Sequence, residues 1–342
     1  MNYVITGGSG FIGSHLVEHW LKNGHSVINI DNFDDFYDYK IKIQNTLESV
    51  GKLLEFSFHE KELDIQKLIF ATSSKSYQLY YQDIRDEAGL EKIFQKHSID
   101  MIIHLAALAG VRPSIERPLD YEEVNIRGTM ILWQLAKKFS VHKFISASSS
   151  SVYGTNKKIP FSETDAVDHP ISPYAATKRC TEILGHVYHH LYNIDMLHLR
   201  FFTVYGPRQR PDLAIYKFTQ NILHRKEIPF YGDGSTSRDY TFIGDIIAGM
   251  QKAIIYLENH DQIYETVNLG ESEVITLQDM VLALEEELGQ AAAKKFLPPQ
   301  PGDMMKTNAN IQKAKLLLHY DPQTPFRAGI KKFVEWFLRN RS

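Results

Sequence analysis

The amino-terminal thirty residues constrain the fold more than any other part of the sequence. Residues 2–6 (NYVIT) form an apolar run of the kind found in strands, and the glycine-rich stretch GGSGFIG follows directly at 7–13. The next stretch, SHLVEHWLKNG, is amphipathic up to Gly24, and a second apolar run, HSVINID, ends at Asp31. A strand, a glycine loop, a helix and a strand in this order predict a βαβ unit that binds a dinucleotide.

The glycine loop and the acid after it indicate which dinucleotide. Glycines allow the tight turn and let the backbone approach a pyrophosphate, whose charge rests on the helix amino terminus. A carboxylate at Asp31 accepts hydrogen bonds from the adenosine ribose and repels a 2′-phosphate, so NAD is expected rather than NADP. The expected cofactor contacts in this unit are Gly7, Gly10, Phe11, Ile12, Gly13, Asp31 and Asn32.

The rest of the chain continues the alternation of strands and helices. Further apolar strands are expected at 77–84, in IDMIIHLAA, in KFISA, in DMLHLRFFTVYG and at 266–270, with helical stretches such as 119–139 between them. Near-continuous apolar strands alternating with helices predict an α/β fold of Rossmann type, a doubly wound parallel sheet covered on both faces. Further cofactor contacts are expected where the third and fourth strands end, at Asp83, Ile84, Leu105, Ala106 and Ala107.

The crossover between Asp31 and Asp83 is long for two neighbouring strands. We expect an inserted helix or excursion near residues 50–76, which is a surface elaboration rather than a site. The expected domains are 1–205, which binds NAD and has returns near 238–268, and 206–342, which is smaller and mainly binds the substrate.

Two short stretches carry the expected chemistry, SASSSSVYG at 146–154 and YAATK at 174–178. Tyr174 and Lys178 are four residues apart and share one face of a helix. A neighbouring ammonium lowers the pKa of a tyrosine, so Tyr174 is expected to act as a base. A serine hydroxyl at the strand end can then relay a proton between that tyrosine and a substrate alcohol. Together these groups predict the oxidation and reduction of a carbinol carbon.

Composition excludes several other classes of protein. The formal net charge of −3 argues against a nucleic-acid partner, and no apolar run approaches the length of a membrane span. The sequence enters a strand at once, which leaves no room for a signal peptide. Cys180 is the only cysteine, which suits a reducing cytoplasm. Histidine pairs at 15/19 and 186/190 lack the context of a metal site, so no metal is expected.

Several motifs together resemble the extended short-chain dehydrogenase/reductase superfamily, and in particular its NAD-dependent UDP-glucuronate 4-epimerases. They are GGSGFIG, HLAALAGVRPS, ASSSSVYG, YAATK, LRFFTVYGPRQRPD, RDYTFIGDI and QPGD. The similarity covers nearly the whole chain except the excursion, which is longer here. It implies a Rossmann domain, a smaller nucleotide-sugar domain, tightly held NAD and a homodimer formed through a four-helix bundle.

The resemblance also implies site residues. Ser149, Tyr174 and Lys178 match the catalytic hydroxyl, the general base and its partner. Arg238 resembles the arginine that binds the UDP diphosphate, and Asp303 the acid that holds the uridine ribose. Thr203 and Arg210 resemble the pair that receives the sugar carboxylate. The remaining expected substrate contacts are Arg112, Ser150 and Ser151.

These residues favour epimerisation at C4 of UDP-glucuronate through a 4-keto sugar. Related dehydratases and decarboxylases carry an acid where this chain has Ser150 and Ser151, although Glu163 or Asp165 could reach in from the following loop. The alternatives are a UDP-N-acetylhexosamine 4-epimerase or dehydratase, and a non-catalytic NAD-binding scaffold. The scaffold class commonly lacks the tyrosine or the lysine, whereas both are present here.

Overall fold

The computed structural model describes residues 1–52, 56–298 and 304–340. Its chain divides into two compact units. Unit 1 comprises residues 1–148, 172–199 and 254–266, and unit 2 comprises residues 149–171, 200–253 and 267–342. The prediction that 1–205 binds NAD and 206–342 mainly the substrate concerns ligands, and it stays a prediction.

A parallel sheet dominates the amino-terminal part, as the alternating pattern predicted. Its seven strands lie in the order β10 (Tyr264–Leu269), β6 (Asp195–Phe201), β5 (Lys143–Ser149), β4 (Met101–His104), β1 (Asn2–Thr6), β2 (Ser26–Asp31) and β3 (Tyr77–Tyr81). The register places Thr6 beside Ile30 of β2 and His104 of β4, so the carboxyl ends of these strands meet at one edge. In an open parallel sheet, ligands bind at that edge.

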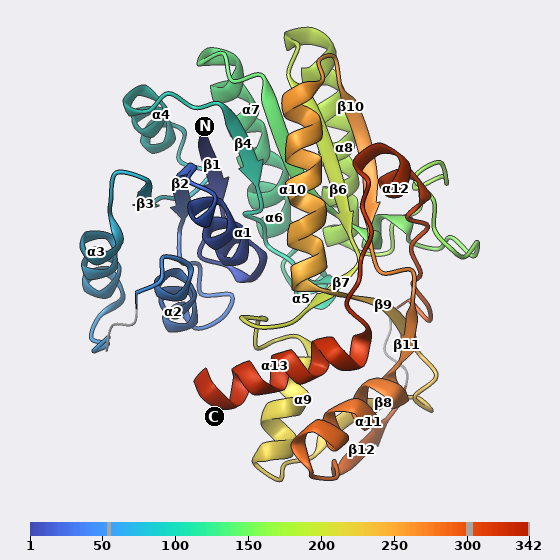
Figure 1. Cartoon of the computed structure of the whole chain (residues 1–342). Helices are drawn as coiled ribbons and strands as arrows, with labels where there is room; N and C mark the ends of the chain where they lie inside the picture. The colour runs from blue at the N-terminus through green and yellow to red at the C-terminus, as the bar shows by residue number, and fades with distance from the viewer. Residues whose placement is uncertain (53–55, 299–303, 341–342) are drawn as a thin grey trace. The chain divides into compact units, whose positions relative to one another are not determined.

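Helices cover both faces of this sheet; in Figure 1, α1 lies in front of it and α7 and α8 lie behind it. The helices of unit 1 are α1 (Phe11–Lys22), α2 (Tyr39–Ser49), α3 (Lys61–Thr72), α4 (Glu87–Lys96), α5 (Val111–Glu116), α6 (Pro118–Tyr121), the π-helical η1 (Glu122–Gly128), α7 (Thr129–Lys138) and α8 (Pro173–Tyr192). Apolar residues of the strands pack against these helices in a core that includes Ile28, Ile102, Phe144 and Trp133. Burying this apolar area is the main favourable term for the fold.

Unit 2 contains two small sheets. One has the strand order β11 (Val274–Thr276), β9 (Ser237–Phe242) and β7 (Thr203–Tyr205), and the other pairs β12 (Lys294–Leu297) with β8 (Ile228–Tyr231). Its helices are the 3₁₀ turn η2 (Ser150–Tyr153), α9 (Ala214–Leu223), α11 (Leu277–Leu288), α12 (Gln312–Leu318) and α13 (Phe326–Asn340). Helix α10 (Ile243–Asn259) begins in unit 2 and ends in unit 1.

Three predicted elements differ in detail. The strand predicted in DMLHLRFFTVYG breaks at Phe202, because β6 pairs in the large sheet whereas β7 pairs with β9. An apolar run does not show such a change of pairing partner. The predicted helix at 119–139 is interrupted by η1, where the side chain of Asn125 bonds to the backbone of Leu108. The third strand ends at Tyr81, so Asp83 and Ile84 lie in the turn after it.

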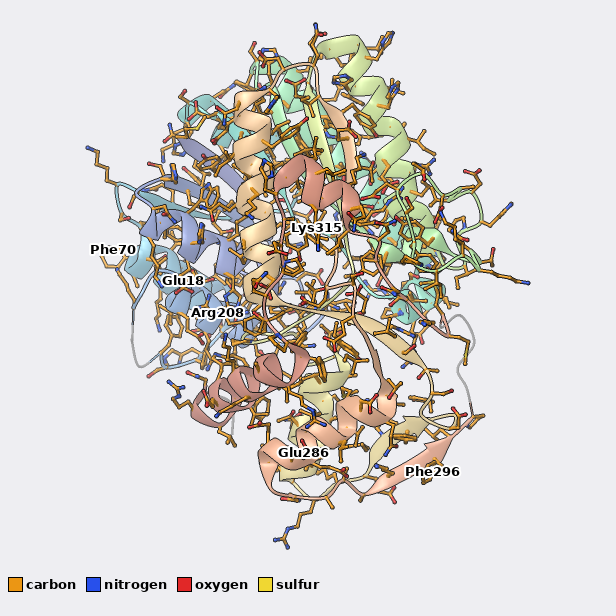
Figure 2. The ribbon with its side chains drawn as sticks, turned by 45° about the vertical axis from the view of Figure 1, so that its right-hand side comes forward. Glu18, Phe70, Arg208, Glu286, Phe296 and Lys315 are labelled. Carbon is orange, nitrogen blue, oxygen red and sulfur yellow. The ribbon has the colours of Figure 1, made fainter. Side chains whose placement is uncertain are left out.

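The predicted excursion contains an additional helix, α3, which confirms an inserted element between β2 and β3. Helix α3 packs against β3 through its buried face, which includes Ile65 and Leu68. Its outer face carries Phe70, whose side chain is 91% exposed and points away from the unit in Figure 2. Lys61, the first residue of this helix, lines a pocket together with Asn32 and Asp83, so the role of the excursion stays a prediction.

Candidate active site

The glycine loop forms the turn that a pyrophosphate requires. Gly7 has φ +72°, its N–H donates to the carbonyl of Ile30 at 2.8 Å, and the N–H of Gly10 donates back to the Gly7 carbonyl at 3.1 Å. A Cβ at Gly7 would lie 2.8 Å from the backbone nitrogen of Ala106, and one at Gly13 would lie 2.7 Å from the Cα of Gly8. Side chains at these positions would therefore force the loop apart.

Helix α1 presents its amino terminus to this loop. Gly10 is its N-cap, and no side chain caps the N–H groups of the first turn, which contains Phe11 and Ile12. Such N–H groups, together with the helix dipole, attract a phosphate. The loop, the glycines and the helix end thus fit a dinucleotide such as NAD.

Asp31 lies next to the glycine loop, and only 6% of its surface is exposed. Its carboxylate accepts hydrogen bonds from the N–H groups of Ser9 at 3.1 Å and Phe33 at 2.8 Å. The amine of Lys42, on the inner face of α2, is 3.7 Å from Oδ1. Asp31 is therefore fixed and charge-balanced, and it can serve as an acceptor for ribose hydroxyls.

The residues expected near the adenine are also brought together. The side-chain amide of Asn32 donates to Asp83 Oδ2 at 2.8 Å. Arg85 donates to the same carboxylate through Nε at 2.9 Å and Nη2 at 2.8 Å. Burial raises the pKa of Asp83, but these hydrogen bonds outweigh burial and lower the pKa below its usual value. Ile84 is buried, and a Cβ at Gly128 would meet its side chain.

The end of β4 provides a backbone of small residues beside the glycine loop. Leu105 and Ala106 donate their N–H groups to the carbonyl and hydroxyl of Thr6, and Ala107 follows them. His104 bridges the hydroxyls of Thr6 and Thr129 at 2.7 and 2.9 Å. Burial, and then the charge of Lys178, lowers the pKa of His104 to about 3, so this ring is neutral.

Helix α8 places the predicted base and its lysine at the edge of unit 1. Ser172 caps the helix by accepting from the N–H of Ala175, and Pro173 occupies its first turn. Tyr174 is partly exposed there and packs edge-on against Tyr121, with ring centroids 6.2 Å apart. Lys178 is 6% exposed and donates to the carbonyl of Ala147 at 2.7 Å. Burial lowers the pKa of Lys178 to about 8, and Glu182 opposes this shift.

The serine cluster belongs to unit 2. Ser149 caps the turn η2, and its Oγ accepts from the backbone N–H of Ser151 at 3.2 Å and from the Ser151 hydroxyl at 3.0 Å. Ser150 and Ser151 form the first turn of η2 and are partly exposed. The hydroxyls of Ser149 and Ser151 thus form a polar pair that can bind a hydroxyl or a carboxylate.

Thr203 and Arg238 lie on neighbouring strands of the three-stranded sheet. Thr203 of β7 is in register with Tyr240 of β9, two residues beyond Arg238. Arg210 follows in a turn and holds Asp212 by a bidentate pair, with Nε–Oδ1 and Nη2–Oδ2 distances of 2.9 Å each. Among the expected substrate contacts, Arg210 and Arg238 thus supply guanidinium groups from unit 2, and that of Arg210 is already oriented by a carboxylate.

Arg112 and Asp303 complete the expected substrate contacts. Arg112 is exposed on α5 of unit 1. Asp303 lies outside the described residues. Within the described ranges, no group of three or more His, Cys, Asp or Glu side chains is arranged to hold a metal ion. None of the helices described there combines the length and apolar character of a membrane span.

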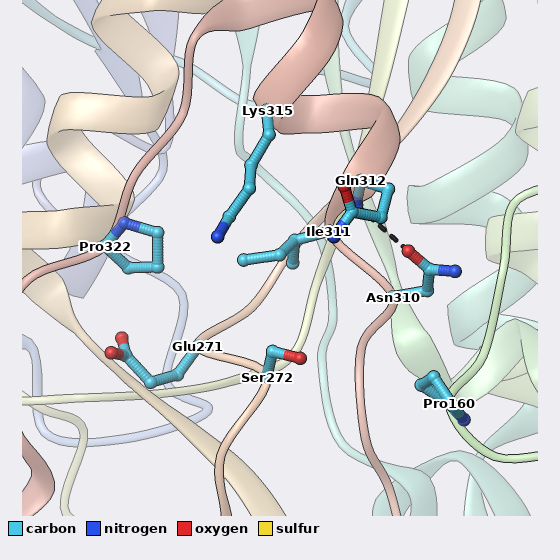
Figure 3. A pocket seen from close by; sticks show the side chains of 8 residues that line it. All are labelled: Pro160, Glu271, Ser272, Asn310, Ile311, Gln312, Lys315 and Pro322. Atoms are coloured by element: carbon cyan, nitrogen blue, oxygen red, sulfur yellow. Dashed lines mark hydrogen bonds between the residues drawn. The ribbon is translucent and has the colours of Figure 1, made fainter.

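A pocket of about 270 Å³ in unit 2 contains none of the expected site residues. Glu271 and Lys315 face it from opposite sides, and Asn310 accepts a hydrogen bond from the N–H of Gln312 within it (Figure 3). Burial, followed by repulsion from Asp245 and Asp239, raises the pKa of Glu271 to about 8. This pocket is distinct from the candidate active site.

Comparison with known proteins identifies the family. The profile of the GDP-mannose 4,6-dehydratase family matches residues 4–333. The chain belongs to this family of extended short-chain dehydrogenases/reductases. A UDP-glucuronate 4-epimerase of Thermodesulfobacterium geofontis is 38% identical over 99% of this chain and 96% of its own length.

Solved structures of other extended short-chain dehydrogenases/reductases share the whole fold. The UDP-glucuronic acid 4-epimerase of Bacillus cereus, in complex with UDP-glucuronic acid and NAD, has a TM-score of 0.86 and 35% identity, over 99% of both chains. The UDP-glucose 4-epimerase of Thermotoga maritima with UDP-glucose has a TM-score of 0.83 and 31% identity, over 100% of both chains. These matches confirm the predicted family and the Rossmann-type fold.

Sequence reasoning missed two charged residues of this short-chain dehydrogenase/reductase. Lys42 balances Asp31, and Glu182, at 1% exposure, lies four residues after Lys178. Each had a signal in the sequence. Lys42 falls on the inner face of a helix that begins soon after Asp31, and Glu182 shares its face of α8 with Tyr174 and Lys178.

Proposed function

We propose that this chain is an NAD-dependent UDP-sugar 4-epimerase that interconverts UDP-glucuronate and UDP-galacturonate through a 4-keto sugar. The observation that carries this proposal is the arrangement on α8, where a partly exposed tyrosine precedes a buried lysine by one turn. The family relatives named for this reaction support the choice of substrate.

NAD, when bound, would supply the hydride acceptor and donor for the change of configuration at C4 of the sugar. The glycine loop and the amino terminus of α1 hold the pyrophosphate, and Asp31 holds the adenosine ribose. Lys178, as an ammonium, favours the phenolate of Tyr174 and binds the nicotinamide ribose. Tyr174 removes the proton of the 4-hydroxyl, and Ser149 shares that proton in the transition state.

The substrate contacts divide between its phosphates and its carboxylate. Arg238 binds the diphosphate, and Asp303 is assigned to the uridine ribose. Arg210 and Thr203 bind the sugar carboxylate, with Ser150 and Ser151 beside it. A guanidinium that holds the carboxylate in place opposes loss of carbon dioxide from the intermediate, which is a β-keto acid.

The nearby acids support epimerisation rather than dehydration. Asp165 accepts hydrogen bonds from Asn156 at 3.2 Å and from the N–H of Ser162 at 2.9 Å, and it pairs with Lys158. Burial opposes ionisation of Asp165, but these contacts outweigh it and lower its pKa. Glu163 accepts from the N–H of Asn268 at 2.8 Å. Both acids are thus engaged in holding the chain rather than in donating a proton.

The decisive experiment uses the purified protein without added NAD. UDP-glucuronate and UDP-N-acetylglucosamine are incubated side by side, and the products are resolved by chromatography and mass spectrometry. We expect UDP-galacturonate, of unchanged mass, from the first substrate. Loss of water from the amino sugar, with UDP-glucuronate untouched, would identify a dehydratase instead. No turnover of either sugar by a protein that retains NAD would favour a scaffold.

We also propose that the protein is a homodimer, in the reducing cytoplasm. Ile183, Val187 and Leu191 follow one another at intervals of four on α8 and are 53, 43 and 58% exposed. Such an apolar stripe on a helix is typical of a helix–helix interface. Light scattering should give twice the mass of 39.4 kDa. Val187→Glu should give the single mass, whereas Leu316→Glu, on exposed α12, should not.

A further inference from the structure

Glu182 is a buried carboxylate to which the proposed mechanism gives no role. It lies on α8, four residues after Lys178, and only 1% of its surface is exposed. Burying a carboxylate is unfavourable unless hydrogen bonds and opposite charges compensate for the lost water. The groups that bind this carboxylate therefore indicate the role of its negative charge.

Three groups bind this residue. The hydroxyl of Ser148 donates to Oε1 at 2.6 Å, and Nη1 of Arg179 donates to Oε2 at 3.1 Å. The backbone carbonyl of Glu182 accepts a hydrogen bond from the hydroxyl of Tyr264. Both carboxylate oxygens are thus engaged, and the side chain has little freedom.

Lys178 and Glu182 hold two consecutive residues of the same strand. Lys178 donates to the carbonyl of Ala147 at 2.7 Å, and Glu182 accepts from the adjacent Ser148. Both side chains come from one face of α8 and reach the carboxyl end of β5. The two contacts together fix the position of α8 along β5, and with it the position and direction of the lysine side chain.

We propose that Glu182 is a positioning residue for Lys178, which it aligns against β5 and whose positive charge it balances. This inference rests on the proposed function, because it assigns Glu182 to the base–lysine pair of that reaction. The negative charge acts through Lys178 and does not touch the substrate. Removing it leaves the amine buried without an opposite charge, and burial favours the neutral form.

The other groups around Lys178 do not replace this charge. His104, from β4, is neutral because burial and the charge of Lys178 itself lower its pKa to about 3. Arg179 is cationic and is bound to Glu182. Tyr174 is the proposed base on the same helix. Burial is the main cause of the lowered pKa of Lys178, and the Glu182 charge is the contribution that opposes it.

The direct test measures the titration of Lys178 itself. In protein labelled with ¹³C-lysine, the Cε resonance of Lys178 is identified by its absence from Lys178→Met and is followed from pH 6 to 11. Glu182→Gln should move its midpoint down by about one pH unit, as expected for the loss of one nearby opposite charge. Arg179→Gln, which removes the cation from Glu182, should move the midpoint up.

The matched control is Asp195→Asn, which removes another buried carboxylate of unit 1, at the start of β6 just after α8 ends. It should leave the midpoint unchanged. An unchanged midpoint in Glu182→Gln would overturn the inference. If that variant does not fold, a midpoint in Arg179→Gln that is unchanged or lower would overturn it equally.

Turnover provides the second readout. In Glu182→Gln the alkaline limb of the kcat profile should move down with the lysine midpoint, while KM for the UDP-sugar stays within about twofold. A kcat that falls equally at every pH would indicate a merely structural role and refute the proposal. A wild-type protein without epimerase activity would refute the proposed function, whereas the lysine titration would still decide the role of Glu182.

Discussion

Arg210→Ala is the variant that most directly tests which sugar this chain accepts. Arg210 lies in the turn after β7, and its side chain is 21% exposed. Asp212 holds one edge of its guanidinium through two bonds of 2.9 Å. Because a guanidinium has five N–H donors in a fixed fork, an arginine that already holds one carboxylate still has donors for hydrogen bonds to a second.

The size of the effect follows from the kind of contact and its exposure. Hydrogen bonds to charged groups contribute about 1.5–3 kcal/mol when they are removed from water. Arg210 and Asp212 are 21 and 37% exposed, so solvent weakens the interaction and the lower part of this range applies. About 2 kcal/mol corresponds to a rise in KM for UDP-glucuronate of roughly 30-fold.

The assay compares two substrates and two variants. KM is measured for UDP-glucuronate and UDP-glucose, and the product mixture is analysed for a UDP-4-keto-pentose formed by loss of carbon dioxide. Arg210→Ala should raise the first KM, leave the second within about twofold and release the keto-pentose. Asp212→Asn keeps the cation and loses only its anchor, so it should change KM by less than about threefold.

Clean UDP-galacturonate and an unchanged KM in Arg210→Ala would refute the reasoning. Equal rises in KM for both sugars would show that Arg210 binds a part that the two substrates share, such as the diphosphate. In either case Thr203 and the serine pair would remain as candidates for the carboxylate.

The other predictions concern the cofactor half of the site. Tyr174→Phe should lower kcat by about 10³ and retain bound NAD, measured by absorbance after denaturation, whereas Tyr192→Phe at the end of the same helix should be active. Gly13→Ala should yield protein without NAD, because the new Cβ lies 2.7 Å from the Cα of Gly8 and displaces the loop. Lys178→Met should change the pH dependence of stability, measured by urea unfolding. The pKa of Lys178 is about 8 in the folded chain and 10.5 without burial. Since the unfolded chain binds more protons between these values, wild-type stability should rise by about 3 kcal/mol from pH 8 to 10.5, and the variant should lack this rise.

Local sequence patterns predicted the parts of the fold that depend on near neighbours. The strand, the glycine loop and Asp31 could be read together because a phosphate turn imposes its requirements within about thirty residues. The spacing of Tyr174 and Lys178 is likewise fixed by one helix. The extra helix α3 was predictable only as an excess of chain between two strands, and its boundaries were not.

Features that depend on distant partners were not predictable from the same patterns. The break at Phe202 arises because β7 pairs with β9, about 35 residues later in the chain, and this changes nothing in the apolar run itself. The π-helical segment arises where Asn125 binds the backbone of Leu108 from another element. Such contacts are specified by tertiary structure, so hydrophobic periodicity alone does not show them.

The missed charges have a common physical origin. A functional charge at the edge of an α/β sheet is partly removed from water, and it needs an opposite charge held nearby to remain ionised. Four of the charged residues that the motifs predicted have such a partner nearby in the sequence. The pairs are Asp31 with Lys42, Asp83 with Arg85, Lys178 with Glu182, and Arg210 with Asp212. When a motif predicts a charged site residue, the opposite charge that stabilises it should therefore also be sought, in the same helix, the next turn or the next helix.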